Sequence, residues 1–129
     1  MPKQAIHHPD RAASTGAYTD GVLVDGWLYI SGQGPLDLQT GQVLSGAIED
    51  EVRLTMDNIG RILDAAGCGF EDVVKCTCHL TDIRDFDRFN AVYAGYFQGI
   101  RPARTTVQSV LDGIKVEIDA VAKVPAPRS

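Results

Sequence analysis

Cysteine is scarce in this chain, and its three cysteines, Cys68, Cys76 and Cys78, form an odd number. No charged stretch followed by an apolar run precedes the first polar residues. A secreted domain held together by disulfides typically has an even cysteine count and such a leader, so this class of protein is disfavoured. We therefore expect reduced thiols and a cytoplasmic location.

Long hydrophobic runs and an excess of positive charge are also missing. Asp, Lys, Arg or Gly interrupts every apolar segment before it reaches the ~18–20 residues needed to cross a bilayer. The chain has 17 acidic residues against 12 basic ones, a formal net charge of -5, and no basic stripe interleaved with aromatics. Because such a surface repels phosphate backbones, we expect neither a membrane nor a nucleic acid as partner.

The composition that remains is that of a globular protein. The chain has 129 residues, and 44% of them are hydrophobic. This length suits one compact core and is too short for two, so we predict a single domain over residues 1–129. The sequence has no internal repeat and no low-complexity segment.

Turn signals and hydrophobic periodicity predict the secondary structure. Asp25-Gly26 provides the positive φ angles of a tight hairpin turn, and Asp112-Gly113 is the same signal near the end of the chain. Apolar residues at spacings of three and four predict two amphipathic helices, the second with Asp85 as its N-cap. Strict alternation predicts a half-buried strand in which Val74, Cys76, Cys78 and Leu80 share the core face. The expected elements are an edge strand at 4–7, strands at 21–24 and 27–31, a surface loop at 34–41, a helix at 47–66, a strand at 73–81, a helix at 85–97, and strands at 104–110 and 114–124.

This order, ββ-α-β-α-ββ, favours an α+β fold in which both helices pack on one face of a β-sheet. The opposite face of the sheet then needs a cover. With one domain available, we expect another copy of the chain to provide it.

Cys76, Cys78 and His79 could suggest a metal site, but the spacing argues against it. Residues two apart in a strand share a face, whereas His79 points to the opposite face, so the three side chains do not converge. We therefore read the cysteines as buried hydrophobic residues and predict no metal site.

Arg104 and Glu117 are the two charged residues whose positions suggest chemistry. Arg104 starts a strand directly after a Pro-bearing loop, from which its planar fork can bind a carboxylate in bidentate fashion. Glu117 lies in the most apolar strand of the chain, on the face opposite its core residues. An interface there could desolvate the carboxylate and prepare it for proton transfer, although a simple salt bridge would also explain it.

Spacing indicates that these two residues do not meet within one chain. A two-residue turn at Asp112-Gly113 would pair Gln108 with Glu117 and Arg104 with Val121. Four residues along a strand span on the order of 13 Å, too far for both side chains to hold one small substrate. If both act, we expect them to meet across a subunit boundary.

Several motifs resemble the RidA (YjgF) family, which is also called the endoribonuclease L-PSP or translation inhibitor family. The resemblance covers nearly the whole chain, and the joint occurrence of Pro-Ala-Arg with the later Glu motif is specific. The motifs are Gly16-Ala-Tyr18, Ile30-Ser-Gly-Gln-Gly-Pro35, Asp57-Asn58-Ile59, Asn90-Ala-Val-Tyr93, Pro102-Ala-Arg104 and Val116-Glu-Ile118.

The resemblance implies a fold, an assembly and an activity. The fold would be of the chorismate-mutase-like type with a mixed sheet, and a homotrimer would join its sheets into a barrel with clefts between subunits. The activity would be hydrolytic deamination of reactive 2-imino acids, such as 2-aminoacrylate, to 2-keto acids and ammonia. An imine carbon is already electrophilic, so a held carboxylate, a placed water and proton transfer suffice, and no cofactor is required.

The resemblance also implies residue roles. Arg104 would bind the substrate carboxylate and Glu117 would orient or activate water. The cleft would be lined by Tyr18, Ser31 and Asn90, with backbone groups at Gly32 and Thr106 adding hydrogen bonds.

Three residues depart from the family pattern and leave other functions open. Ala17 and Asp20 stand where the family commonly has Pro and Gln, and Thr106 stands where many active members have Cys, so no thiol-dependent behaviour is expected there. A non-catalytic trimer that binds a small carboxylate metabolite is one alternative. A specialised deaminase of another amino-substituted unsaturated acid is a second, and a ribonuclease is disfavoured by the acidic charge.

Overall fold

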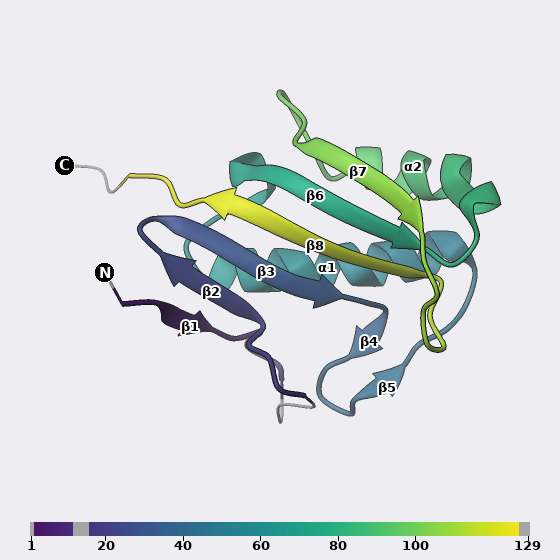
Figure 1. The fold of residues 1–129 in the computed structure, drawn as a ribbon, viewed down its shortest axis with the longest axis horizontal. Helices are drawn as coiled ribbons and strands as arrows, with labels where there is room; N and C mark the ends of the chain where they lie inside the picture. Colours follow the sequence, from purple (N-terminus) through teal and green to yellow (C-terminus); the bar gives the residue numbers. More distant parts are fainter. Residues whose placement is uncertain (1, 12–15, 127–129) are drawn as a thin grey trace.

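The computed structural model describes residues 2–11 and 16–126, and its centre is one six-stranded mixed sheet (Figure 1). The strand order is β1-β2-β3-β8-β6-β7. Both helices lie behind this sheet in the view of Figure 1, so the predicted α+β architecture is confirmed. The elements are β1 (Gln4–Ile6), β2 (Gly21–Val24), β3 (Trp27–Gln33), β4 (Leu36–Asp37), β5 (Gln42–Val43), α1 (Ile48–Ala65), β6 (Val73–Leu80), α2 (Phe86–Ala94), β7 (Ala103–Gln108) and β8 (Val116–Lys123), with 3-10 turns at Phe70–Asp72 and Ile83–Asp85.

The first predicted hairpin is present. Asp25 and Gly26 adopt φ angles of 52° and 80°, and Val24 pairs directly with Trp27. Both turn residues occupy the left-handed region that a two-residue hairpin requires. The expected edge strand also forms, since β1 pairs antiparallel with β2.

Helix α1 forms where the spacing of apolar residues predicted a helix at 47–66. Its apolar positions are buried, three acidic residues occupy its first turn, and Gly67 follows its end with a φ of 76°. Anions favour the positive end of the helix dipole, and a left-handed glycine ends the helix without steric cost. None of the helices in the described part of the chain is long and apolar enough to cross a membrane.

Three local predictions need correction. Val74 is exposed and Val73 is buried instead, because the pairing of β6 with β8 shifts between Val73 and Lys75 and turns one residue outward. Asp85 precedes α2 but makes no side-chain capping bond, while Asp82 accepts a hydrogen bond from the backbone N–H of Arg84 and caps the preceding 3-10 turn instead. Helix α2 also ends at Ala94, before residue 97, where we predicted its end.

The predicted surface loop at 34–41 contains part of a small ribbon. Strands β4 and β5 pair with each other outside the main sheet, and the Asp37 carboxylate accepts hydrogen bonds from the backbone N–H groups of Gln39 and Thr40 in the turn between them. The Asn58 side chain holds the entry to this ribbon by donating to the carbonyls of Gly34 and Leu36.

The second predicted hairpin is wrong. β7 and β8 do not pair, because β6 lies between them, and Arg104 pairs with Cys76 rather than with Val121. Gly113 does adopt a turn conformation with φ 76°, but it lies inside a longer connection between the two strands.

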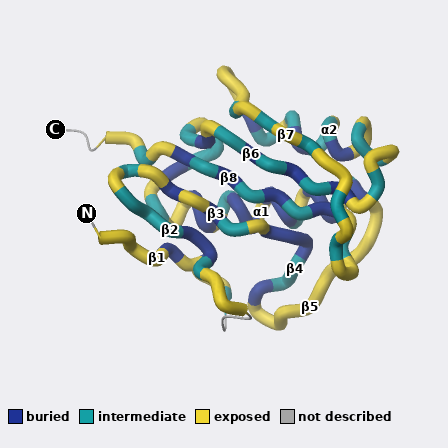
Figure 2. The backbone as a smooth tube through the Cα atoms, in the orientation of Figure 1, coloured by how far each residue is buried: buried dark blue, intermediate teal, exposed yellow. Residues whose placement is uncertain are grey.

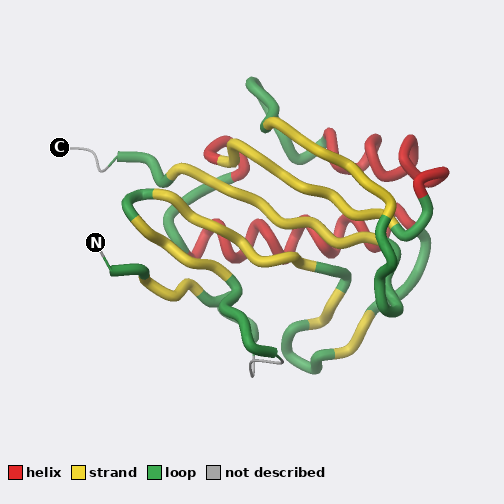
Figure 3. The backbone as a smooth tube through the Cα atoms, in the orientation of Figure 1, coloured by secondary structure: helices red, strands yellow, loops and turns green. Residues whose placement is uncertain are grey.

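The helical connection explains this arrangement. Helix α2 leads from β6 to β7 and returns the chain in the same direction, so β7 adds parallel to β6 at the edge of the sheet (Figure 3). β8 then fills the centre between β3 and β6. Its alternate residues Val116, Ile118, Ala120 and Ala122 are buried against the helices, a degree of burial that an edge position would not give.

The two faces of the sheet differ in cover. One face joins α1 and α2 in a single buried core, to which both β6 cysteines belong. Burial raises the pKa of the Cys78 thiol to about 12, so this thiol stays protonated. The other face has no covering layer among the described residues, and buried and half-buried residues alternate along its strands (Figure 2).

Candidate active site

Four of the predicted site residues, Tyr18, Ser31, Gly32 and Glu117, line one cavity of about 330 Å³. We call this group the acidic half-site. Glu117 lies near the start of β8 and alternates with the buried residues of that strand, so its side chain points to the uncovered face. The carboxylate has no hydrogen-bond or ion-pair partner within residues 2–11 and 16–126, and it is therefore free to meet a ligand.

Hydrogen bonds fix the wall of this half-site opposite Glu117. The Ser31 hydroxyl donates to the carbonyl of Thr19 at 2.6 Å, and the Ser31 backbone N–H donates to the carbonyl of Asp20 at 2.9 Å. These bonds tie the segment that carries Tyr18 to β3, whose pairing with β8 is irregular between Ile30 and Gln33. An irregular register of this kind redirects side chains, as bulges next to sites commonly do.

Asp20, one of the departures from the family pattern, holds Arg11 beside the Tyr18 ring. Its buried carboxylate forms an ion pair of 2.8 Å with Arg11, whose guanidinium carbon lies 5.8 Å from the centre of the Tyr18 ring. The same carboxylate accepts a hydrogen bond from the backbone N–H of His8. Asp20 therefore attaches the first residues of the chain to the acidic half-site.

Gly32 lets the Glu117 carboxylate approach the backbone of β3. A Cβ atom at this position would lie 2.9 Å from both Cδ and Oε2 of Glu117. Gly32→Ala therefore should displace the carboxylate and lower kcat/KM by about 10- to 100-fold, the effect of a misplacement near 1 Å. Turnover and thermal unfolding measurements check this expectation.

Gly46→Ala is the matched control for that prediction, because a Cβ atom there would make only ordinary contacts with Asp50. Gly46→Ala should leave turnover unchanged. Equal activity of Gly32→Ala and the wild type would contradict the close approach of Glu117 to β3.

Two further predicted residues, Asn90 and Arg104, lie together in a second cavity. Asn90, Tyr93, Ala94, Arg101, Pro102 and Arg104 line a cavity of about 360 Å³, which we call the arginine half-site. The guanidinium of Arg104 donates to the Asn90 side-chain carbonyl at 2.7 Å. This bond assigns Asn90 to orienting the guanidinium, whereas the resemblance suggested only that it lines the cleft.

Aromatic rings of α2 restrain Arg104 further. Its guanidinium carbon lies 4.9 Å from the centre of the Tyr93 ring, 5.3 Å from Phe86 and 5.5 Å from Phe89. Cation–π contacts at these distances hold a guanidinium without using its N–H groups. The remaining N–H groups have no partner among the described residues, so the fork stays available for a carboxylate.

Thr106 lies two residues beyond Arg104 on the same face of β7, beside Cys78. It lines neither half-site cavity, and its hydroxyl is buried without a hydrogen-bond partner in the described structure. The Tyr93 hydroxyl is likewise buried, and burial raises its pKa. The structure thus leaves Thr106 next to the arginine half-site but gives its side chain no contact there.

The two half-sites lie on opposite faces of the sheet. Arg104 points to the helices, while Glu117 points to the uncovered face, and two strand spacings and three residues separate them. These offsets give a separation of roughly 14 Å between their backbones. The predicted pairing of Arg104 with Val121 is wrong, but the conclusion drawn from it holds. Within one chain, Arg104 and Glu117 are too far apart to contact one small substrate.

The sequence analysis missed four residues that line the arginine half-site, namely Tyr93, Ala94, Arg101 and Pro102. Arg101 and Pro102 belong to the same short stretch as Arg104, which was the available signal. Tyr93 was named only as the last residue of the motif Asn90-Ala-Val-Tyr93. Among residues 2–11 and 16–126, no group of three His, Cys, Asp or Glu side chains could hold a metal ion.

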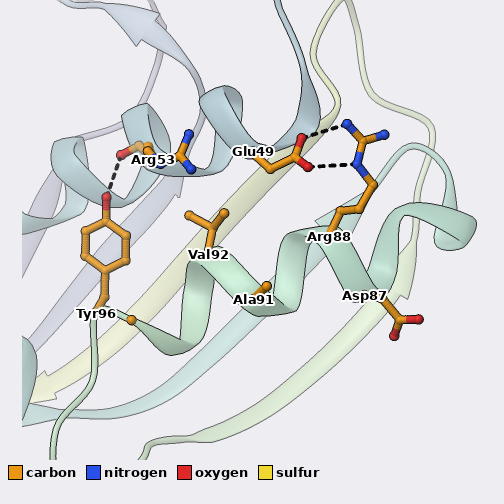
Figure 4. Close-up of a pocket in the computed structure, with 8 residues that line it drawn as sticks. Glu49, Arg53, Asp87, Arg88, Ala91, Val92 and Tyr96 are labelled. Carbon is orange, nitrogen blue, oxygen red and sulfur yellow. Dashed lines mark hydrogen bonds and ion pairs between the residues drawn. The ribbon is translucent and has the colours of Figure 1, made fainter.

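A larger cavity of about 650 Å³ lies between α1 and α2 and shares no lining residue with either half-site (Figure 4). Three of its charged groups are already paired: Arg88 binds Glu49 through two hydrogen bonds of 2.9 and 2.7 Å, and Arg53 pairs with Asp50. Tyr96 donates to the carbonyl of Arg53 and to Asp57. Asp87 also lines this cavity and has no hydrogen-bond or ion-pair partner among the described residues, but one exposed carboxylate without a neighbouring base or nucleophile is no basis for placing chemistry there.

Comparison with known proteins agrees with the fold and the motifs. The family model described as Endoribonuclease L-PSP matches residues 8–124. The chain belongs to the endoribonuclease L-PSP family. Both half-sites fall within the matched residues.

Individual relatives of this L-PSP family protein extend over nearly the whole chain. A rat protein named 2-iminobutanoate/2-iminopropanoate deaminase is 45% identical over 122 residues, which cover 93% of this chain and 89% of the rat protein. The crystal structure of YyfA from Yersinia pestis, described as a protein of unknown function of the conserved Rid family, has a TM-score of 0.89 and 35% identity, covering 95% of this chain and 100% of its own. The structure of E. coli TdcF with bound serine has a TM-score of 0.85 and 33% identity, covering 93% of this chain and 98% of its own.

Proposed function

We propose that this L-PSP family protein hydrolyses 2-imino acids to 2-keto acids and ammonia. The observation that carries the proposal is the 45% identity, over 93% of the chain, with a rat protein named for deamination of 2-iminobutanoate and 2-iminopropanoate. In the reaction, water adds to the C=N carbon, and the resulting carbinolamine loses ammonia and leaves a ketone. The substrates share a carboxylate next to the reacting carbon, and the Arg104 guanidinium, whose remaining N–H groups have no partner among the described residues, suits it.

Arg104 is the proposed carboxylate anchor. Its bond to Asn90 and its contacts with three aromatic rings restrain the side chain before substrate arrives. A guanidinium that is already restrained loses little freedom on binding and can donate parallel hydrogen bonds to both carboxylate oxygens. Arg101 lines the same cavity and adds positive charge at its entrance.

Glu117 is the proposed group that orients and activates water. An unpaired carboxylate next to an electrophilic carbon can accept a proton from attacking water and return it to the departing nitrogen. Tyr18 and Ser31 line the same cavity, and the exposed backbone at Gly32 lies beside the carboxylate. Thr106 is proposed to contribute through its backbone alone.

A homotrimer is the proposed assembly, with each site formed between neighbouring subunits. Two features support it: the half-sites lie on opposite faces of one sheet, and the uncovered face exposes Trp27 by 38% and Tyr29 by 48%. A symmetric oligomer covers such a face and can place the arginine half-site of one subunit against the acidic half-site of the next. A single domain over residues 1–129 and a cytoplasmic location complete the proposal, the latter supported by three free, buried cysteines.

The proposal is tested by generating 2-imino acids in place with an amino-acid oxidase and trapping them with semicarbazide. An active protein competes with the trap, so the semicarbazone signal falls while 2-keto acid and ammonia rise in equal amounts. A semicarbazone yield unchanged by the protein across imines from small and large amino acids would contradict the proposal. Binding of the imine without turnover would instead support a carboxylate-binding trimer.

A further inference from the structure

The Tyr18 ring is one wall of the acidic half-site, and the hydrogen bonds of its own segment do not fix its direction. Tyr18 is 45% exposed, and its hydroxyl has no hydrogen-bond partner within residues 2–11 and 16–126. The bonds that tie this segment to β3 use the carbonyls of Thr19 and Asp20, which follow Tyr18 along the chain. These bonds hold the backbone, so the direction of the ring depends on the groups that lie against it.

Gly16 and Arg11 both lie against the Tyr18 ring. Gly16 comes so close that a Cβ atom there would lie 2.9 Å from Cε1 and 3.0 Å from Cδ1 of the ring. The guanidinium carbon of Arg11 lies 5.8 Å from the ring centre, within the range in which an aromatic ring attracts a cation. Because Gly16 offers only backbone, Arg11 is the side chain that can direct the ring.

The buried Asp20 carboxylate holds Arg11 in this position. Its Oδ1 and Oδ2 atoms lie 2.8 and 3.0 Å from Nε of Arg11. The same carboxylate accepts a hydrogen bond of 2.9 Å from the backbone N–H of His8. A bond of 3.1 Å from the Arg11 backbone N–H to the His8 carbonyl closes the turn at residues 8–11. Asp20 therefore holds both ends of the turn that carries Arg11.

This ion pair is better explained by orientation than by stability. A buried ion pair adds little to the free energy of unfolding, because the desolvation of both charges offsets most of their attraction. It does fix geometry, since the donors of a planar guanidinium point in set directions. The side chains of Arg11 and Asp20 are only 9% and 2% exposed, and the contact of Arg11 with Tyr18 extends this geometry to the half-site.

We propose that Arg11 and Asp20 are positioning residues for Tyr18: their ion pair holds the ring as a wall of the acidic half-site and keeps its hydroxyl directed at the substrate. The inference rests on the proposed function, because it gives Tyr18 a hydrogen bond to the substrate of that reaction. Neither Arg11 nor Asp20 lines the cavity, so both act through the ring.

Arg11→Met/Asp20→Asn, which we call the paired variant, removes the ion pair with the least damage to the fold. Loss of one partner would leave a buried charge unpaired, whereas loss of both charges avoids that cost. The Asn oxygen also remains a hydrogen-bond acceptor for the turn. Arg61→Met is the matched control, because Arg61 pairs with Asp10 of the same turn at 3.6 Å and has no cation–π contact within the described ranges.

The first test measures the order of the ring and needs no turnover. NMR relaxation of ¹³C-labelled tyrosine rings gives an order parameter for each ring, and the Tyr18 signal is identified by its absence in Tyr18→Ala. In the paired variant the Tyr18 value should fall to about 0.6 or below, the range of flexible groups. The other three tyrosines, and every ring in Arg61→Met, should keep their wild-type values.

Arg11→Lys provides a second variant for the same measurement. It keeps a positive charge opposite Asp20, so no buried charge is left unpaired, but it lacks the planar guanidinium. The order parameter of Tyr18 should fall here too, by less than in the paired variant. A Tyr18 ring as ordered as in the wild type in every folded variant would overturn the proposal.

The second test measures the consequence for the reaction. A hydrogen bond from Tyr18 that is made equally to the substrate and to the transition state lowers KM and leaves kcat nearly unchanged. The paired variant should therefore raise KM by about 3- to 10-fold, the value of one hydrogen bond. Arg61→Met should keep both wild-type constants.

Combination with Tyr18→Ala shows whether the ion pair acts through the ring. Without the ring the ion pair has nothing to direct, so adding the paired substitutions to Tyr18→Ala should raise KM no further. Additive increases in KM, or a paired variant with the wild-type KM, would contradict the role of Arg11 and Asp20. Absence of turnover in the wild type would contradict the proposed function instead, and the order of the Tyr18 ring would still decide whether the ion pair holds it.

Discussion

Replacing Arg104 with alanine is expected to lower kcat/KM for 2-imino acid hydrolysis by about 10²- to 10⁴-fold, the loss of two hydrogen bonds to a charged carboxylate. The substitution removes the guanidinium that α2 holds in place through Asn90 and the Tyr93 ring. The semicarbazide competition assay measures the loss. An Arg104→Ala protein that still folds and turns over at the wild-type rate would contradict the assignment of the carboxylate anchor.

Arg104→Lys separates charge from geometry. Lysine keeps the positive charge but lacks the planar fork, so activity between those of the wild type and Arg104→Ala is expected. Circular dichroism and thermal unfolding of each variant show whether the loss reflects the site or the stacking of the guanidinium on α2. Equal activity of Arg104→Lys and the wild type would show that charge alone binds the substrate.

Replacing Glu117 with glutamine is expected to lower kcat by about 10²- to 10⁴-fold with little change in KM, because general acid–base catalysis is lost while the carboxylate anchor remains. The side chain keeps its size and its approach to Gly32. Steady-state kinetics over a range of substrate concentrations separate the two constants. A rise in KM at constant kcat would instead assign Glu117 to substrate binding.

Asp64→Asn serves as the control for Glu117→Gln, because it also removes one acidic charge but on the exposed surface of α1. Its kinetics should match those of the wild type. A comparable loss in both variants would point to net charge rather than to the position of Glu117.

Local sequence signals predicted most of the elements. Asp25-Gly26 predicted the hairpin because both residues tolerate the left-handed conformation that the turn requires. The spacing of apolar residues predicted α1 because one side of this helix is buried. The alternation in β6 correctly sent both cysteines to the core. It failed at Val74, where a shift in pairing with β8 reversed the inward and outward positions.

Long-range pairing was the part that sequence did not predict. Asp112-Gly113 indicated a turn, and the turn exists, but it does not specify which strand lies alongside β7. That choice depends on the path of α2, which returns the chain parallel to β6. The predicted separation of Arg104 from Glu117 was reached through a wrong register, and the structure adds that the two side chains lie on opposite faces of the sheet.

Motifs predicted Tyr18, Ser31, Gly32 and Glu117 in one cavity and Asn90 and Arg104 in the other. They did not predict the contacts that hold these side chains in place. Nothing in the sequence shows that Asn90 and three rings of α2 hold Arg104, because these contacts need the helix and the edge strand in place. The contact of Arg11 with the Tyr18 ring likewise depends on Asp20 lying against the turn at residues 8–11.

Complementation between two inactive variants tests the central claim most directly, namely that each site takes Arg104 from one subunit and Glu117 from its neighbour. Arg104→Ala and Glu117→Gln are mixed in equal amounts, dissociated and reassembled. In a cyclic trimer every mixed assembly regains one intact site, so random mixing restores about a quarter of the wild-type activity. Each variant carried alone through the same treatment should remain inactive. Activity in the mixture no higher than in the separate variants would contradict a site shared between subunits.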